Sequence, residues 1–460
     1  MLDRLFTPSS LAIIGASNNS QKSGGSFLKS LIDFHYAGRL YPVNPGASEV
    51  MGLKSYPSIG EIPEAVDLVI ITIPSRAVPQ TLRACVEKKV KFVIVHTAGF
   101  SEIGVEGKVL EAKLSEAIRG SETRVVGPNC LGLYCPQSRI STIMPSFTSS
   151  LGSKATGSVS FIAQSGWATE SVIVEGYERG LRYNKILSIG NQCDLTTADY
   201  LEYLGSDPQT KVIMAYLEEI KDARRFLSIA KQVAAEKPVI IWKSGKTDAG
   251  ARAAASHTGS LAGSYPILLN AFKQAGIISV DTICELIDMA VAFSSTYLPT
   301  GNRMGVLVEA GGGAVAAADA CEKFGLTVPL FSSETQSAIT TFLTDLGSPT
   351  PSPKNPVDLV WPPADKMDQI ITTCIELMTG ECDGILWITY HSLKDEAFAD
   401  NILKLQDKLK KPIIPIPALP TTQTNGFAVY TRQGIPVFTR IERAAKAVSA
   451  MARFSMNSKR

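Results

Sequence analysis

Short apolar runs, most of them bounded by Gly, Pro or Asn, alternate along this chain with longer stretches of helical periodicity. Buried strands separated by helices are typical of a parallel sheet that helices cover on both faces. The first series of such runs predicts strands at residues 11–14, 40–43, 68–73, 92–95 and 124–126. A loop rich in Ser, Gly and Thr follows it at residues 146–157.

Two further series repeat this pattern. The second predicts strands at residues 158–162, 185–189, 212–217, 239–242 and 277–280. The third begins after the segment 297–302 and predicts strands at 304–308, 326–330, 356–360, 384–389, 412–416 and 435–438. We therefore expect an α/β protein with three consecutive doubly wound parallel-sheet domains, at residues 1–145, 146–298 and 299–460.

Composition agrees with this organisation and narrows the function. A length of 460 residues suits about three domains of ordinary size. The net charge is +2 and the basic residues are scattered, so we expect no nucleic-acid partner. No secretory leader and no apolar run of the ~20 residues needed to cross a membrane is visible, so we expect a cytoplasmic protein without a membrane partner. The eight cysteines form no Cys-x-x-Cys pair and the four histidines lack ligand spacing, so we expect no metal site.

Ligands of open parallel sheets bind at the carboxyl ends of the strands. After the first strand, the turn from Gly15 to Gly25 would let the backbone approach a phosphate, with Ser17 in the turn and Lys22 as a possible counter-charge. It lacks the Gly-x-Gly-x-x-Gly spacing of a dinucleotide site, and a plain tight turn would also explain it. Loops shaped by Pro and Asn follow the other strands of this sheet, at Asn44, Pro45, Pro74 and Asn129. A flat, adenine-bearing ligand could lie over them.

Two later strands enter a helix through small residues. Ser165 and Gly166 open one helix, and Gly311, Gly312 and Gly313 open the other. Free N–H groups at a helix N-terminus bind anions such as phosphate. An ordinary helix cap and a tight strand-helix junction are the bland alternatives.

His257 stands among small residues, in the stretch Ala-Ala-Ala-Ser-His-Thr-Gly-Ser-Leu-Ala-Gly. Such neighbours leave an imidazole uncrowded, as a group that accepts and releases a phosphoryl group requires. A carboxylate would have to hold its second ring nitrogen. Glu218 or Glu219, after the predicted strand 212–217, could supply it.

Taken together, these stretches resemble the NDP-forming acyl-CoA synthetase superfamily, relatives of succinyl-CoA synthetase, and specifically the alpha subunits of ADP-forming acetate–CoA ligases. The resemblance covers nearly the whole chain. Its most specific part is Ser-His-Thr-Gly-Ser-Leu-Ala-Gly at 256–263, and it also includes Tyr-Pro-Val-Asn-Pro at 41–45, Gly-Pro-Asn-Cys-Leu-Gly at 127–132, Gln-Ser-Gly at 164–166, Gly-Asn at 190–191, Tyr-Leu-Glu at 216–218 and Lys-Asn-Pro-Val-Asp at 354–358.

The resemblance implies a Rossmann-like CoA-binding domain followed by two flavodoxin-like domains. His257 would carry the phosphoryl group, and Glu218 would be its partner. Ser165 and Gly166 would bind phosphate at one helix N-terminus, and Gly311, Gly312 and Gly313 would bind it at another. The residues implied to contact CoA are Gly15, Ser17, Lys22, Asn44, Pro45, Pro74 and Asn129.

The activity implied is the reversible conversion of acyl-CoA, ADP and phosphate into a carboxylic acid, ATP and CoA. ADP or ATP with Mg²⁺ would bind mainly to an ATP-grasp beta subunit, in an α2β2 heterotetramer. The chain has no Walker-type phosphate loop, since Ile240 stands where the first Gly before Ser244-Gly245-Lys246-Thr247 should be. No sequence pattern reveals the preferred acid.

Two residues depart from the family pattern. Trp167 occupies a position that is usually small, and Glu309 stands in a turn that usually begins with Asn, where a carboxylate would oppose phosphate unless it points away. Both favour the alternative of a non-catalytic CoA-binding regulatory subunit. A second alternative, an NAD-dependent oxidoreductase, is disfavoured by the missing Gly-x-Gly-x-x-Gly.

Overall fold

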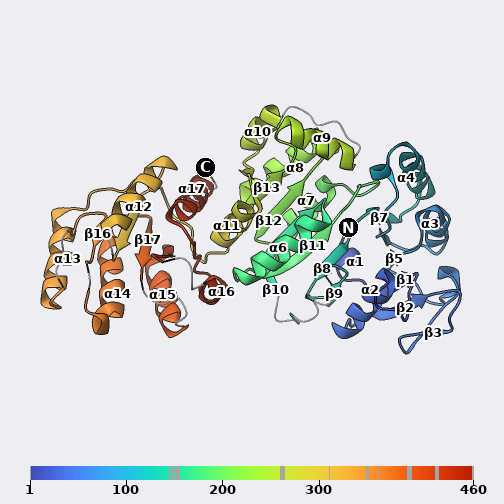
Figure 1. The fold of residues 1–460 in the computed structure, drawn as a ribbon, viewed down its shortest axis with the longest axis horizontal. Helices are drawn as coiled ribbons and strands as arrows, with labels where there is room; N and C mark the ends of the chain where they lie inside the picture. Colours follow the sequence, from blue (N-terminus) through green and yellow to red (C-terminus); the bar gives the residue numbers. More distant parts are fainter. Residues whose placement is uncertain are drawn as a thin grey trace. The chain divides into compact units, whose positions relative to one another are not determined.

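The computed structural model describes residues 2–144, 147, 151, 156–258, 265–309, 311–348, 352–360, 362–390, 396–419 and 424–457, with the side chains of 254–258 and 424–426 outside the description. The chain divides into two compact units. Unit 1 comprises Met1–Ile173 and Arg182–Ile283, and unit 2 comprises Val174–Leu181 and Cys284–Arg460. Each unit is an α/β structure built on parallel strands (Figure 1).

The first sheet of unit 1 has five parallel strands in the order β2-β1-β5-β6-β7. They are β1 (Ser10–Ile14), β2 (Arg39–Val43), β5 (Leu68–Ile71), β6 (Phe92–Val95) and β7 (Arg124–Val126). Helices α3 (Val78–Glu87) and α4 (Val105–Ala117) supply Leu82 and Leu114 to the core on one face. Helix α2 (Ser23–Asp33) packs Phe27 and Leu31 into a different core on the other face. The first predicted domain therefore has the doubly wound form expected.

The second sheet of unit 1 has seven strands in the order β14-β13-β12-β10-β11-β8-β9. The parallel strands are β10 (Thr156–Ala163), β11 (Tyr183–Ser188), β12 (Val212–Leu217), β13 (Val239–Lys243) and β14 (Ile278–Val280). Strands β8 (Gly132–Cys135) and β9 (Ile140–Ser141) differ from the expected all-parallel pattern, because they form a hairpin that joins β11 antiparallel. A short hairpin connection allows only antiparallel pairing.

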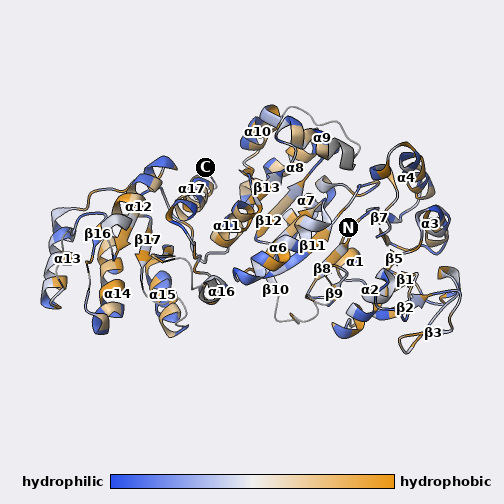
Figure 2. Cartoon of the chain, in the orientation of Figure 1, coloured by the Kyte–Doolittle hydropathy of each residue, from blue (hydrophilic) through white to orange (hydrophobic). Residues whose placement is uncertain are grey.

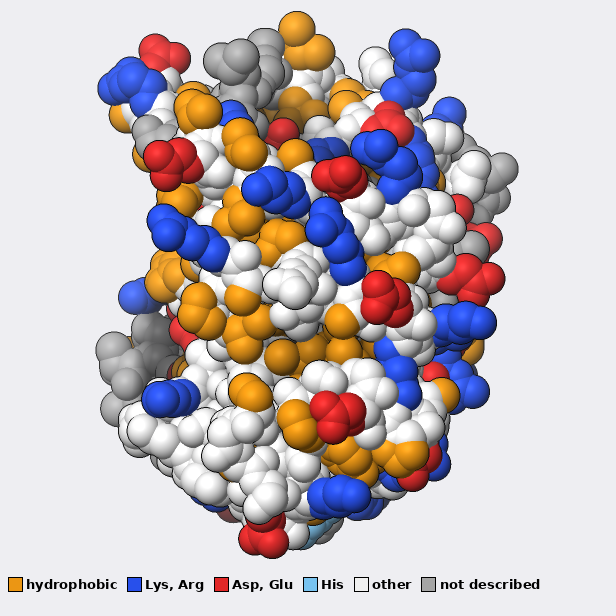
Figure 3. All heavy atoms as spheres, turned by 90° about the vertical axis from the view of Figure 1, so that its right-hand side faces the viewer, with side chains coloured by type: hydrophobic (Ala, Val, Ile, Leu, Met, Phe, Trp, Pro, Cys, Tyr) orange, Lys and Arg blue, Asp and Glu red, His pale blue; other side chains and the backbone are white. Residues whose placement is uncertain are grey.

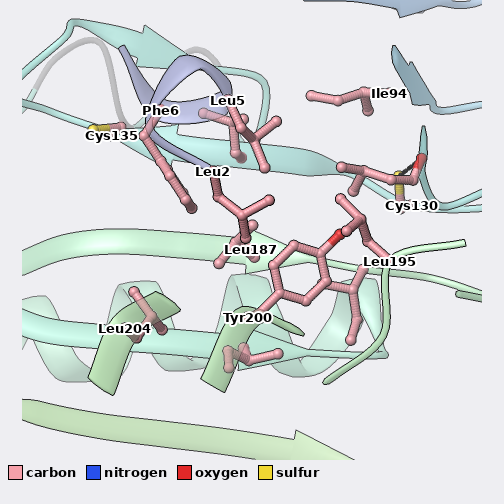
Figure 4. Close-up of a cluster of buried hydrophobic side chains, with 14 of the residues drawn as sticks. Leu2, Leu5, Phe6, Ile94, Cys130, Cys135, Leu187, Leu195, Tyr200 and Leu204 are labelled. Atoms are coloured by element: carbon pink, nitrogen blue, oxygen red, sulfur yellow. Dashed lines mark hydrogen bonds between the residues drawn. The ribbon is translucent and has the colours of Figure 1, made fainter. Parts of the chain in front are cut away.

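A continuous apolar core joins the two sheets of unit 1. Figure 4 shows side chains from helix α1 (Asp3–Phe6), the β8–β9 hairpin and helix α7 (Thr197–Ser206) gathered in it. Phe6 and Tyr200 are both fully buried there, and Leu187 of β11 joins them. Apolar burial of this kind fixes the two sheets relative to each other.

Unit 2 has a four-stranded parallel sheet in the order β16-β15-β17-β18. Its strands are β15 (Met304–Val308), β16 (Val357–Asp358), β17 (Gly384–Thr389) and β18 (Ile413–Pro417). Its helices include α12 (Gly311–Lys323), α13 (Ser333–Asp345), α14 (Met367–Met378), α15 (Glu396–Leu409) and α17 (Ile441–Asn457). Figure 2 shows the apolar colouring of the strands against the polar outer faces of the helices.

Two strands predicted for this third sheet are wrong. In 326–330, Thr327 makes only an isolated bridge to Arg303, and 435–438 contains no strand although Val437 and Phe438 are fully buried. Each segment contains a proline, Pro329 or Pro436, which lacks the N–H that a central strand must donate. The run 435–438 is therefore a buried connection, whereas in 326–330 Leu326 is buried but Leu330 is 66% exposed, and neither run is a strand.

The charged side chains are scattered over the surface, as the sequence suggests. On the face of the molecule in Figure 3, Lys and Arg side chains are interspersed with Asp and Glu. Among the described residues, no helix is both long and apolar enough to cross a membrane.

Candidate active site

The turn after β1 is folded tightly onto itself. Gly15 has φ +95°, in the region that favours glycine. A Cβ on Gly24 would lie 2.1 Å from the Gly15 carbonyl oxygen, and one on Gly25 would lie 2.1 Å from that of Asn19. Ser17 Oγ accepts a hydrogen bond from the Asn19 N–H, and the exposed Lys22 directly precedes α2. The glycines are therefore needed for the tight fold of this turn, and its approach to a phosphate stays a prediction.

The neighbouring loops of the first sheet bind to this turn. Asn44, after β2, donates from Nδ2 to the Ala16 carbonyl at 2.8 Å and accepts the Gly46 N–H at 2.8 Å. Pro45 and Pro74 are exposed on the loops after β2 and β5. These residues therefore lie where the sequence placed them, at the carboxyl ends of parallel strands.

His96 connects the loop after β6 to the same turn. Its Nδ1 lies 2.7 Å from the Cys130 carbonyl oxygen and its Nε2 lies 3.2 Å from Ser23 Oγ. Since a carbonyl only accepts, Nδ1 carries the proton and Nε2 accepts from the Ser23 hydroxyl. Burial lowers the pKa of His96, and the Cys130 hydrogen bond offsets part of that effect.

The loop after β7 meets the second sheet. Asn129 has φ +56°, and its Nδ2 lies 3.3 Å from Asn191 Oδ1. Gly190, which follows β11, also has positive φ, and a Cβ there would lie 2.1 Å from the Pro128 carbonyl oxygen. Only glycine allows the two loops to approach this closely.

Helix α6 (Gly166–Glu178) begins directly after Ser165, at the end of β10. Ser165 Oγ accepts the Ala168 N–H at 3.4 Å, and the Ser165 carbonyl accepts the Thr169 hydroxyl at 2.7 Å. Ser165 therefore caps the helix, which was the purely structural alternative for this residue. The structure leaves its role toward phosphate a prediction.

Glu218 and Glu219 begin the loop after β12 and are only partly buried. The Tyr216 hydroxyl hydrogen-bonds the Glu218 side chain. Burial raises the pKa of Tyr216, a hydrogen bond with Ser244 opposes part of that shift, and the charge of Glu218 and its hydrogen bond add to it. The carboxylate of Glu218 is thus held near the end of its own strand.

A polar pocket lies where these loops meet. The loops of the first sheet supply Ser101 and Asn129. Those of the second sheet supply Gln164, Gly190, Asn191, Gln192, Glu218, Glu219 and Lys221. One cavity therefore joins the edge predicted to bind CoA to the edge that carries Glu218.

Asn191 organises one wall of this pocket. Its Nδ2 lies 2.6 Å from Glu102 Oε2, 2.9 Å from Glu111 Oε2 and 3.1 Å from Ser101 Oγ. Burial alone would raise the pKa of Glu102, but the hydrogen bonds from Asn191 and from backbone N–H groups outweigh it and hold the pKa below its usual value. Glu102 therefore serves as a fixed anionic anchor for the wall.

His257 belongs to helix α9 (Asp248–Thr258), which follows β13. Its side chain, and the residues 259–264 after the helix, lie outside the described part of the chain. Helix α9 packs against the short helix η3 (Ser101–Ile103), whose Ser101 lines the pocket. The element that carries His257 is therefore placed beside the pocket.

In unit 2, Gly311, Gly312 and Gly313 form the first turn of α12. Glu309, just before this turn, is 5% exposed and points into its own domain. Its carboxylate accepts from Thr389 Oγ1 at 2.5 Å, the Tyr390 N–H at 2.8 Å and Trp387 Nε1 at 3.4 Å. The orientation removes the objection that this carboxylate opposes phosphate at the glycine turn.

Trp167, the second departure from the family pattern, is 61% exposed at the start of α6. Its ring packs edge-on against Trp242, which packs edge-on against Tyr216. Tyr216 in turn bonds Glu218. This residue is therefore connected to the pocket wall.

Several residues that line the pocket were not predicted from the sequence. Ser101, Gln192 and Lys221 had no motif around them, and Asn191 belonged to the Gly-Asn stretch of the family resemblance but had no role assigned to it. Lys243, which hydrogen-bonds the Glu218 carbonyl, was also not predicted, although a lysine at the carboxyl end of the apolar strand β13 was an available signal.

Comparison with known proteins agrees with this geometry. Residues 9–136 match the CoA binding domain family, and residues 156–293 match the succinyl-CoA ligase like flavodoxin domain. The fold and the pocket thus define a CoA-binding protein of the succinyl-CoA ligase type.

Full-length relatives specify the class further. The chain is 37% identical to the acetate–CoA ligase (ADP-forming) II alpha subunit of Pyrococcus furiosus, covering 99% of this chain and 98% of the relative. It is 35% identical to acetate–CoA ligase (ADP-forming) I of Archaeoglobus fulgidus, but spans only 64% of that longer protein. An acetyl-coenzyme A synthetase of Ca. Korarchaeum cryptofilum, solved with phosphate and ADP, is 31% identical and superposes with a TM-score of 0.88, covering 100% of this chain and 98% of that one. The chain belongs to the family of ADP-forming acetate–CoA ligase alpha subunits, which are acid–thiol ligase components.

A first prediction concerns the contact between the two loops. We expect Gly190→Ala to destabilise unit 1 by roughly 1–3 kcal/mol more than Gly120→Ala, because its methyl group would collide with the Pro128 and Asn129 carbonyl oxygens. Gly120 is the matched control, since it also has positive φ but has open space around a Cβ. Urea denaturation of both variants measures the difference, and equal losses would contradict the close contact.

A second prediction concerns pH. Because its pKa is lowered in the fold, His96 takes up a proton at a lower pH in the folded chain than in the unfolded chain, where a histidine titrates near pH 6.5. His96 therefore stabilises the fold above that pH, and the contribution is lost as pH falls below it. We expect the denaturation midpoint of the wild type to fall more between pH 7.5 and 5.5 than that of His96→Asn. The exposed His35→Asn is the control, and parallel curves for wild type and His96→Asn would contradict the assignment.

Proposed function

We propose that this chain performs the CoA and phosphoryl-transfer steps of an ADP-forming acyl-CoA synthetase. Acyl-CoA, ADP and phosphate would reversibly become a carboxylic acid, ATP and CoA. The observation that carries the proposal is one pocket that Asn129 from the CoA-binding sheet and Glu218 from the second sheet both line. Reactants bound at the two edges would share one cavity.

The reaction proceeds in three transfers. A phosphate oxygen attacks the acyl carbonyl carbon, the C–S bond breaks, and CoA leaves as thiolate to give an acyl phosphate. A ring nitrogen of His257 then attacks phosphorus, and the P–O bond to the acyl group breaks to release the carboxylate. Finally an oxygen of ADP attacks the phosphohistidine and the P–N bond breaks, giving ATP and neutral His257. A covalent intermediate divides one difficult transfer into easier steps.

Glu218 holds the second ring nitrogen of His257 in this proposal. Such a carboxylate fixes the orientation of the imidazole and stabilises it when it becomes charged. Support comes from the packing of α9 against η3 at the pocket wall, and from the hydrogen bond that holds the Glu218 side chain.

Backbone groups would bind the anions. Ser165 and Gly166 at α6 would hold phosphate in unit 1, and Gly311, Gly312 and Gly313 at α12 would do so in unit 2. The turn and loops with Gly15, Ser17, Lys22, Asn44, Pro45, Pro74 and Asn129 would contact CoA. The inward orientation of Glu309 supports the role of the α12 turn.

A partner subunit would supply the nucleotide site. We assign ADP or ATP with Mg²⁺ mainly to an ATP-grasp beta subunit in an α2β2 assembly. The P. furiosus relative is named an alpha subunit, while the A. fulgidus relative, named an acetate–CoA ligase (ADP-forming) without a subunit, is longer than this chain. The eight free cysteines support a reducing, cytoplasmic location.

A non-catalytic CoA-binding regulatory subunit is the second candidate. The exposed Trp167, beside the proposed phosphate cradle, is the observation that favours it. Phosphorylation of His257 separates the two functions, because a regulatory subunit has no need of a covalent intermediate.

We expect His257→Ala and His257→Asn to abolish phosphoprotein formation and acid release while CoA binding persists. The imidazole is the proposed nucleophile, and CoA binding needs only the first sheet. Incubation with acetyl-CoA and labelled phosphate, followed by acid and base treatment of the protein, measures an acid-labile, base-stable phosphate. Ser256→Ala is the control from the same segment, and labelling that survives in His257→Ala would overturn the proposed function.

We also expect the purified chain to bind CoA but to make ATP only after the beta subunit is added. Transfer from phosphohistidine to ADP requires a nucleotide site that we assign to the partner. ATP formed from acetyl-CoA, ADP and phosphate is measured with each subunit alone and with both together. Sustained synthesis by this chain, in a preparation free of other polypeptides, would contradict the division of roles.

A further inference from the structure

Gln164 is the residue between β10 and the cap of α6, and only 9% of it is exposed. Its Oε1 accepts the Glu218 N–H at 2.5 Å and the Glu219 N–H at 2.8 Å. Its Nε2 donates to the Glu219 carbonyl at 2.6 Å. One amide side chain therefore binds three successive polar groups of the loop that carries Glu218.

The backbone of Gln164 is fixed as firmly as its side chain. Its N–H donates to the Tyr216 carbonyl at 3.2 Å, and its neighbour Ser165 caps α6. Gln164 is thus the chain neighbour of Ser165 in the proposed phosphate cradle, and it is also hydrogen-bonded to the loop that carries Glu218. A displacement of either would be transmitted to the other.

Lys243 holds this loop from the opposite side. Strand β12 lies between β13 and β10, and Lys243 Nζ at the end of β13 donates to the Glu218 carbonyl at 2.8 Å. It also donates to the Ser244 carbonyl at 2.6 Å. Burial lowers the pKa of Lys243, and the nearby Glu218 and Glu219 offset part of that effect. The loop is therefore tethered from both neighbouring strands.

We propose that Gln164 is a positioning residue that sets the distance and direction of the Glu218 carboxylate from the phosphate cradle at Ser165 and Gly166. The inference rests on the proposed function, because it acts through Glu218. An amide suits this position since it offers an acceptor for two N–H groups and a donor for a carbonyl. An ionised Glu would lack the donor and would add a third carboxylate beside Glu218 and Glu219.

The test is a double-mutant cycle on the full chain in complex with its beta subunit. The variants are Gln164→Met, Glu218→Gln and the double variant, and the rate of phosphohistidine formation from acetyl-CoA and labelled phosphate is the readout. Gln406→Met is the matched control, since Gln406 is also buried and accepts a backbone N–H, from Ile413 at 2.8 Å, but belongs to unit 2. CoA binding and thermal melting monitor the fold. If Gln164→Met does not bind CoA, Gln164→Glu replaces it in the cycle, because both acceptor contacts remain possible.

We expect Gln164→Met to slow phosphorylation by roughly 10-fold or more, as loss of an orienting partner does, and Gln406→Met to leave it within about twofold. The double variant should be no slower than Glu218→Gln alone, because Gln164 acts through that carboxylate. A wild-type rate for Gln164→Met, losses that multiply in the double variant, or a silent Glu218→Gln would each overturn the inference. The His257→Ala variant separates failure of this inference from failure of the proposed function. If His257→Ala is still phosphorylated, the proposed function itself is wrong.

Discussion

The apolar core shared by the two sheets of unit 1 is the constraint on which the candidate site depends. Helix α1, the β8–β9 hairpin and α7 contribute to the same buried cluster (Figure 4). Helix α2 of the first domain also packs into this cluster. A close-packed interior of this kind transmits displacement rather than absorbing it. The loops after β7 and β11 can therefore meet in a fixed geometry, and the pocket exists because the core beneath it is continuous.

Polar side chains then convert this placement into a rigid site. Three side chains hydrogen-bond backbone atoms of neighbouring loops: Gln164, Lys243 and Lys221. Lys221 donates to the carbonyls of Asn191 and Gln192. Buried hydrogen bonds of this type contribute modestly to net stability but are costly to leave unmade. Their value here is positional, because they fix the loop backbone around a carboxylate whose direction matters.

Much of this organisation could be predicted from the sequence. Apolar runs bounded by turns identified all five strands of the first sheet and the parallel strands of the second, and the loops with Gly15, Asn44 and Asn129 lie at the expected edge. The runs containing Pro329 and Pro436 were wrongly predicted as strands, because a short apolar run reports neither strand pairing nor, at the exposed Leu330, burial. The antiparallel β8–β9 hairpin and the contacts of Gln164 were also missed. They depend on which residues become neighbours after folding, and no spacing along the chain records that.

The two departures from the family pattern have different physical consequences. Glu309 is compensated within its own domain, since Thr389, Tyr390 and Trp387 supply the donors that a buried carboxylate requires. The contacts of Trp167, in contrast, lead toward the pocket. Its exposed ring contacts Trp242, that ring contacts Tyr216, and the Tyr216 hydroxyl bonds the Glu218 side chain. A substitution at Trp167 can therefore reach the proposed catalytic carboxylate through three packed aromatic rings, whereas the carboxylate of Glu309 is already satisfied where it stands.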